Sequence, residues 1–96
     1  MKMLAIVCDM GLEERILAGL RRINVSGYTC VPNLLGLGRT GRRDNDPVWP
    51  GSNSMILVAM PDEGVGSVLE MLRRLKGEYL RPPALHVFAW ESQDLL

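Results

Sequence analysis

The feature that most constrains the fold is a regular alternation between short aliphatic runs and two stretches of helical periodicity. Apolar residues recur every three to four positions from Leu12 to Ile23 and again from Val65 to Leu75. This spacing gathers them on one side of a helix. The aliphatic runs are short and are closed by turn-forming residues, which favours strands. In chain order, the predicted elements are a strand at 2–8, a helix at 12–23, strands at 27–35 and 54–60, a helix that Asp62 caps and Gly77 ends, and a strand at 84–90.

This order in so short a chain predicts the ferredoxin-like α+β arrangement, βαββαβ, in which an antiparallel four-stranded sheet carries two helices on one face. Right-handed crossovers leave few alternatives. The run from Lys2 to Cys8 is almost entirely apolar, so we expect this strand to be buried on both faces and central in the sheet. Pro32 cannot donate a ladder hydrogen bond, so its strand is expected at an edge or with a bulge.

The length of 96 residues predicts one domain, residues 1–96, with a thin hydrophobic core. Two cysteines offer no dense set of disulfides to compensate. The third and fourth strands are apolar at nearly every position, including Met55, Phe88 and Trp90, although the helices cover only one face of the sheet. We therefore expect the other face to pack against copies of the same chain.

The charge balance narrows the possible partners. Eleven Lys and Arg residues against eleven Asp and Glu residues give a formal net charge of zero, so no overall field recruits nucleic acid or anionic lipid. The apolar run after Lys2 stops at Asp9 and is far too short for a secretion signal or a membrane span. We expect a cytoplasmic protein that binds no nucleic acid and reaches a membrane only through a partner.

The connection between the second and third strands, residues 36–53, is far longer than a hairpin needs. Loops of that length in compact domains are commonly functional. It begins with Gly36, Gly38 and Arg39. The glycines let backbone amides approach an anion, and the guanidinium can bind phosphate or carboxylate with two hydrogen bonds. The start of the loop is therefore a candidate anion site.

Side chains later in the same loop suit a protein partner. Arginine and aromatic residues dominate the hot spots of interfaces, and the loop offers Arg42, Arg43 and Trp49. We interpret this part as a partner-binding segment. A first alternative function follows from it, namely an interaction module that docks to a target protein without any small effector.

Several pieces of the chain together resemble the nitrogen-regulatory PII signalling family. The resemblance covers roughly residues 2–75, and its main motif is a Gly-x-Thr after the first helix, followed by Gly-x-Gly-Arg at the start of the long loop. The pieces that carry it are Lys2 to Val7, Ile23 to Thr29, Leu35 to Arg39, and Pro61-Asp62 with Val65 and Val68.

The resemblance implies a compact homotrimer that binds small effectors in the clefts between its subunits, typically adenine nucleotides such as ATP, ADP or AMP. It also implies a regulatory protein whose long loop contacts a target enzyme, transporter or channel. By position, the nucleotide base and sugar would lie against Gly27, Tyr28 and Thr29, and the phosphates against Gly36, Gly38 and Arg39.

The chain departs from the PII pattern at several places, two of which bear on ligand binding. Thr40 stands where PII proteins carry a Gln that is tied to magnesium and 2-oxoglutarate, so 2-oxoglutarate sensing is not expected. The Gly-x-Gly-Lys turn that grips phosphates before the last strand is replaced by residues 79–84, in which Pro82 and Pro83 have no amide hydrogen to donate. These departures indicate a divergent PII-like protein.

A second alternative is a trimer that binds divalent metals, because CutA-like proteins share this architecture. The candidate ligands would be Cys8, Asp9, Cys30 and His86, but their spacing shows no ligand motif, and we predict no metal site. His86 is the only histidine and has no carboxylate or nucleophile beside it in the sequence. We therefore predict no catalytic residues and no enzymatic activity.

Overall fold

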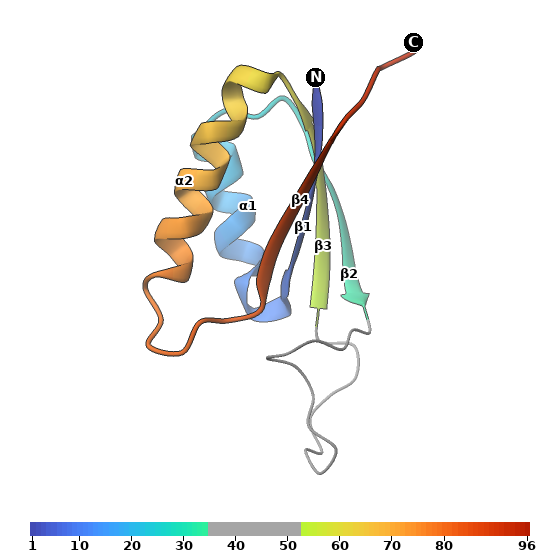
Figure 1. Ribbon diagram of the computed structural model, residues 1–96. Coiled ribbons are helices and arrows are strands. Elements are labelled where there is room, and N and C mark those ends of the chain that lie inside the picture. The colour runs from blue at the N-terminus through green and yellow to red at the C-terminus, as the bar shows by residue number, and fades with distance from the viewer. Residues whose placement is uncertain (35–52) are drawn as a thin grey trace.

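The protein folds into one antiparallel sheet of four strands with both helices against the same face (Figure 1). The computed structural model describes residues 1–34 and 53–96. Its elements are β1 (Lys2–Asp9), the 3₁₀ turn η1 (Met10–Leu12), α1 (Glu13–Arg22), β2 (Thr29–Leu34), β3 (Asn53–Met60), the 3₁₀ turn η2 (Asp62–Gly64), α2 (Val65–Lys76) and β4 (Leu85–Glu91). This order and layering confirm the predicted ferredoxin-like α+β fold.

Strand β1 is central, as its apolar sequence predicted. The strand order is β2-β3-β1-β4, and β1 pairs with β3 on one side and β4 on the other. Its side chains alternate between the two faces, with Leu4, Ile6 and Cys8 fully buried toward the helices. On the opposite face, Met3 and Val7 are only half-buried, so within one chain this face of the sheet is incompletely covered.

The two helices complete the core from one side. Helix α1 contributes Ile16 and Leu20, which are fully buried, and α2 contributes Val68. The helices approach closely at Gly19, where an added Cβ would lie 2.7 Å from the sulfur of Met71. In residues 1–34 and 53–96, neither helix is long and apolar enough to cross a membrane.

Strand β2 is an irregular edge strand, as Pro32 predicted. Its register against β3 shifts between Val31 and Leu34, and Asn33 adopts a left-handed backbone with φ of 60°. The predicted strand at 27–35 is therefore shorter in the structure. It begins at Thr29, after the turn that carries Gly27 and Tyr28.

The start of the second helix differs from the prediction. Asp62 does not cap α2, because the turn η2 precedes the helix and Gly64 occupies the capping position without a side-chain hydrogen bond. The Asp62 carboxylate instead lies 3.3 Å from the amino group of Met1. Asn53 also differs, since it was assigned to the loop but belongs to β3, where it pairs with Asp9 and Leu34.

The sheet face opposite the helices is largely apolar and only partly covered, and we call it the open face. The register places Trp90 beside Met3 and Phe88 beside Ala5, with Phe88 59% exposed and Trp90 49% exposed. Alternation along β3 adds Leu57 to the same face. Its central residues are Met3, Ala5, Val7, Met55, Leu57, Ala59, His86, Phe88 and Trp90.

Candidate functional site

A sharp turn after α1 presents the first group of predicted site residues. The helix stops because Asn24 takes a left-handed backbone with φ of 60°, and the Val25 amide then donates to the Leu20 carbonyl at 3.2 Å. The chain reverses and enters β2 at Thr29, which pairs with Leu57 of β3. Gly27, Tyr28 and Thr29 are all exposed on this turn.

Gly27 and Tyr28 are both accessible. The position of Gly27 is free of close neighbours, whereas the side chain of Tyr28 is held by a hydrogen bond. No atom of the described residues lies within 4 Å of the position that a Cβ on Gly27 would occupy, and its backbone is not left-handed. Neither packing nor conformation therefore requires a glycine there. Tyr28 is 36% exposed, and its hydroxyl oxygen accepts a hydrogen bond of 2.9 Å from Nη1 of Arg21 on α1.

The second group of predicted site residues comes after the far end of β2. Thr29 begins the strand and Leu34 ends it, and five residue steps at about 3.3 Å each separate them by about 17 Å. The two groups are thus attached to opposite ends of one strand. The residues predicted for phosphate and partner binding lie outside the described residues: Gly36, Gly38, Arg39, Arg42, Arg43 and Trp49.

The turn between α2 and β4 is held by Arg15 of α1, a contact that the sequence did not indicate. The Arg15 guanidinium pairs with the Glu78 carboxylate, donates to the Tyr79 hydroxyl at 2.8 Å, and lies 5.7 Å from the centre of the Tyr79 ring. The Glu78 and Tyr79 hydrogen bonds raise the pKa of Arg15. The turn rejoins the sheet where the Asp9 amide donates to the Ala84 carbonyl at 2.9 Å.

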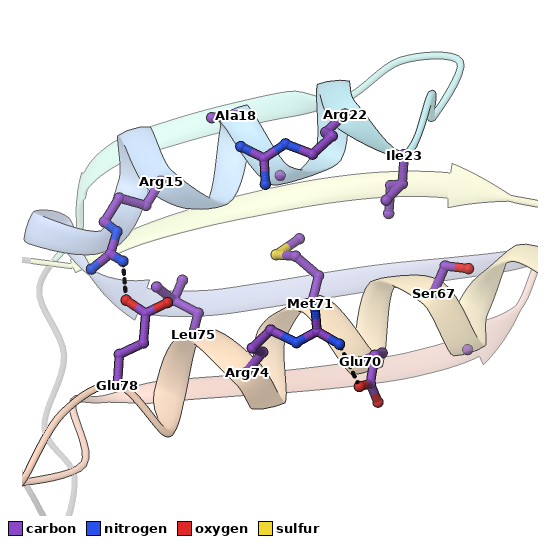
Figure 2. Close-up of a pocket in the computed structure, with 12 residues that line it drawn as sticks. Arg15, Ala18, Arg22, Ile23, Ser67, Glu70, Met71, Arg74, Leu75 and Glu78 are labelled. Atoms are coloured by element: carbon purple, nitrogen blue, oxygen red, sulfur yellow. Dashed lines mark hydrogen bonds and ion pairs between the residues drawn. The ribbon is translucent and has the colours of Figure 1, made fainter.

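A groove of about 590 Å³ separates the outer surfaces of α1 and α2 (Figure 2). The side chain of Met71 points into it from α2, and Arg22 reaches over it from α1. Two ion pairs border it, Arg15 with Glu78 and Arg74 with Glu70. The sequence analysis missed this groove, although the small residues that widen it were visible as Ala18-Gly19 and Gly66-Ser67.

Glu13 of α1 is hydrogen-bonded to the sheet near the start of β3. The hydroxyl of Ser54, which is fully buried near the start of β3, donates to Oε1 of Glu13 at 2.6 Å. Burial, with a smaller contribution from Glu13, raises the pKa of the Cys30 thiol. Burial raises the pKa of Cys8 to about 11, with smaller contributions from Glu13 and Asp9.

Comparison with known proteins places this geometry in a family. The family model described as nitrogen regulatory protein P-II matches residues 1–80, which is most of the chain. The chain belongs to the P-II family. No curated protein matches its sequence significantly.

Solved structures of PII-like proteins extend the match over nearly the whole chain. The PII-like protein CPII from Thiomonas intermedia K12, bound to ADP, AMP and bicarbonate, is 30% identical with a TM-score of 0.74, covering 93% of this chain and 86% of CPII. The apo form of CPII is 28% identical with a TM-score of 0.66, covering 93% and 87%. A protein of Thermus thermophilus described as PII-like is 27% identical with a TM-score of 0.59, covering 93% and 83%.

As a P-II family member, the chain is a regulatory protein of ferredoxin-like fold. The metal-binding alternative named Cys8, Asp9, Cys30 and His86 as candidate ligands. Residues 1–34 and 53–96 contain no group of three or more His, Cys, Asp or Glu side chains that could hold a metal ion. Burial raises the pKa of both Cys8 and Cys30, so the thiolate that a metal binds forms less readily there than in an exposed cysteine. His86 lies apart on the open face, beside the ring of Phe88.

Proposed function

We propose that this chain is one subunit of a cytoplasmic homotrimer that binds an adenine nucleotide between subunits and signals to a target protein through residues 36–53. The chain would form one PII-like domain over residues 1–96 and would act by binding rather than catalysis. The target would be an enzyme, a transporter or a channel, so any contact with a membrane would be made through that partner.

The open face is the observation that carries this proposal. It presents a contiguous apolar surface across β3, β1 and β4, with two large aromatic side chains about half exposed. Exposed apolar patches of this kind mark interaction surfaces, because covering them releases water from apolar area. A thin core in a chain of 96 residues adds a second reason to associate. Copies of the same chain are the partners that the family match favours.

The separation of the two residue groups explains why the site would need more than one subunit. Gly27, Tyr28 and Thr29 lie at the start of β2, whereas Gly36, Gly38 and Arg39 follow its other end, beyond Leu34. A cleft between neighbours would let one subunit supply the base-binding group and the next supply the phosphate-binding group.

The local chemistry fits a nucleotide with few phosphates. The open space beside Gly27 and the exposed ring of Tyr28 suit a flat heterocyclic base. Pro82 and Pro83 lack amide hydrogens, so the turn before β4 offers fewer backbone donors to phosphate than a glycine turn would. Phosphate binding would then depend on Gly36, Gly38 and Arg39.

Signalling would follow because phosphate binding depends on residues at the start of the segment that contacts the target. When Arg39 and the neighbouring amides bind an anion, the loop conformations that permit this contact become more populated. Arg42, Arg43 and Trp49 lie a few residues further along and would contact the target. Nucleotide occupancy would thereby change the affinity for the target protein.

The test combines light scattering with calorimetric titration of ATP, ADP and AMP, each with and without magnesium and bicarbonate. We expect a trimer that binds about one nucleotide per subunit. Arg39→Ala should weaken binding by about 1.5 to 3 kcal/mol, because it removes hydrogen bonds to a charged group. Arg43→Ala, which removes the same charge from the same loop, is the control and should bind normally.

Two other outcomes of this test would count against the proposed function. A trimer that releases no heat and binds none of the three nucleotides would support the effector-free docking module, which the two prolines of the 79–84 turn already favour. A stable monomer would contradict the trimer and, with it, the nucleotide site between subunits.

A further inference from the structure

We infer that Arg21 is a positioning residue of the nucleotide site, which holds the Tyr28 ring as a stacking surface for the base. This inference rests on the proposed function and adds a residue that the P-II motif residues do not include. It starts from the hydrogen bond of 2.9 Å from Arg21 Nη1 to the Tyr28 hydroxyl. The bond joins the last turn of α1 to the residue before β2, across the reversal at Asn24.

An aromatic side chain binds a nucleotide base more tightly when its ring is already held in place. Tyr28 lies on an exposed turn and is 36% exposed, so part of its surface is covered and part is open to a ligand. The bond from Arg21 fixes the far end of the side chain and leaves ring surface accessible. A ring ordered in advance binds more tightly, because less side-chain entropy is lost when the ligand arrives. Bases stack on such rings regardless of their identity, since every base has a π-face.

The neighbouring Gly27 is consistent with an approach from outside. Neither the backbone conformation nor the packing at position 27 requires a glycine, and the space beside this position is open among the described residues. A flat ligand can therefore reach the turn next to Tyr28 without meeting a Cβ. The two residues together offer clearance at one position and a fixed aromatic ring at the next.

Arg22 provides a matched control within the same helix. Arg21 and Arg22 are adjacent, both are exposed in the last turn of α1, and both carry one positive charge. Their side chains serve different surfaces, because Arg22 lines the groove between α1 and α2 (Figure 2) and Arg21 binds Tyr28. Replacing either one changes the net charge equally, and only Arg21→Met removes the contact to the ring.

The test is calorimetric titration of the full-length protein with AMP and with ADP. We expect Arg21→Met to raise the dissociation constant about three- to tenfold, the effect of one hydrogen bond, and Arg22→Met to leave it unchanged. The factor should be the same for AMP and ADP, because both carry the same adenosine. Arg21→Lys keeps a charged donor and should recover part of the affinity.

Tyr28→Phe completes the cycle by keeping the ring and removing its hydroxyl. If Arg21 acts through that hydroxyl, the double variant should bind no more weakly than either single variant. Additive losses, equal losses in the Arg21 and Arg22 variants, or a larger loss for ADP than for AMP would each overturn the inference while nucleotide binding itself stands. Absence of AMP and ADP binding by the unaltered trimer would instead overturn the proposed nucleotide site, and this inference with it.

Discussion

Placing a carboxylate on the open face through Phe88→Asp should separate the subunits without unfolding them. A phenylalanine buries about 150–250 Å² when fully covered. Phe88 is 59% exposed in the single chain, so about 90–150 Å² remains for a partner to cover. At about 25 cal/mol per Å², this area contributes about 2–4 kcal/mol of association free energy per subunit.

The aspartate removes that contribution and adds a second cost. A carboxylate enclosed in an apolar interface loses its hydration, at an effective cost of several kcal/mol. The isolated chain bears neither cost, because the side chain at position 88 is exposed to water in it. The variant should therefore fold and fail to associate.

Light scattering at several protein concentrations measures the outcome directly. The unaltered chain of 10.7 kDa should give a particle of about three times that mass, and Phe88→Asp should give the mass of one chain. Ala89→Asp is the control, since Ala89 is exposed on the same strand but alternates to the other side of the sheet. A Phe88→Asp variant that keeps the trimer mass would refute the assignment of the open face as the interface.

Three further predictions concern the core and the loop base, all measured by urea unfolding at one protein concentration. Ser54→Ala should lose about 1–3 kcal/mol, because it removes the only donor that Ser54 offers to Glu13, and unchanged stability would show that the bond contributes nothing. The free energy of unfolding should fall by about 2 kcal/mol as pH rises from 9 to 11, because the folded chain keeps the Cys8 proton that the unfolded chain releases, and Cys8→Ala should lack this part of the fall. Gly19→Ala should stabilise α1 by up to about 1 kcal/mol, because the flexible Met71 side chain can shift within the groove that it already occupies (Figure 2), and a loss of stability would refute this.

The fold was predictable because its signals are local in the sequence. The buried face of β1, with Leu4 and Ile6, follows from a single apolar run, and the irregular edge strand follows from Pro32 alone. Asp62 misled the prediction because the sequence does not show that a 3₁₀ turn precedes the helix and moves the capping position to Gly64.

The contacts around the candidate site were not predictable, because they join residues that are far apart in the sequence. Arg15 meets Tyr79 across 64 residues, and Ser54 meets Glu13 across 41. No periodicity or motif links residues at such separations, since only the packing of α1 against the sheet and α2 brings them together. Tyr28 was found by resemblance to a family motif, whereas Arg21, which holds it, belongs to no motif and became visible only with the structure.

The irregularity of β2 has a consequence for how copies of this chain can join. A sheet grows without limit when one free edge pairs with the opposite edge of the next molecule, and such growth yields fibres. Here one edge is interrupted by Pro32 and by the reversed backbone of Asn33, so it offers no unbroken ladder to an incoming strand. End-to-end polymerisation needs both edges, so it is blocked at β2. Association through the faces of the sheet stays open to the copies, and there a finite assembly can close.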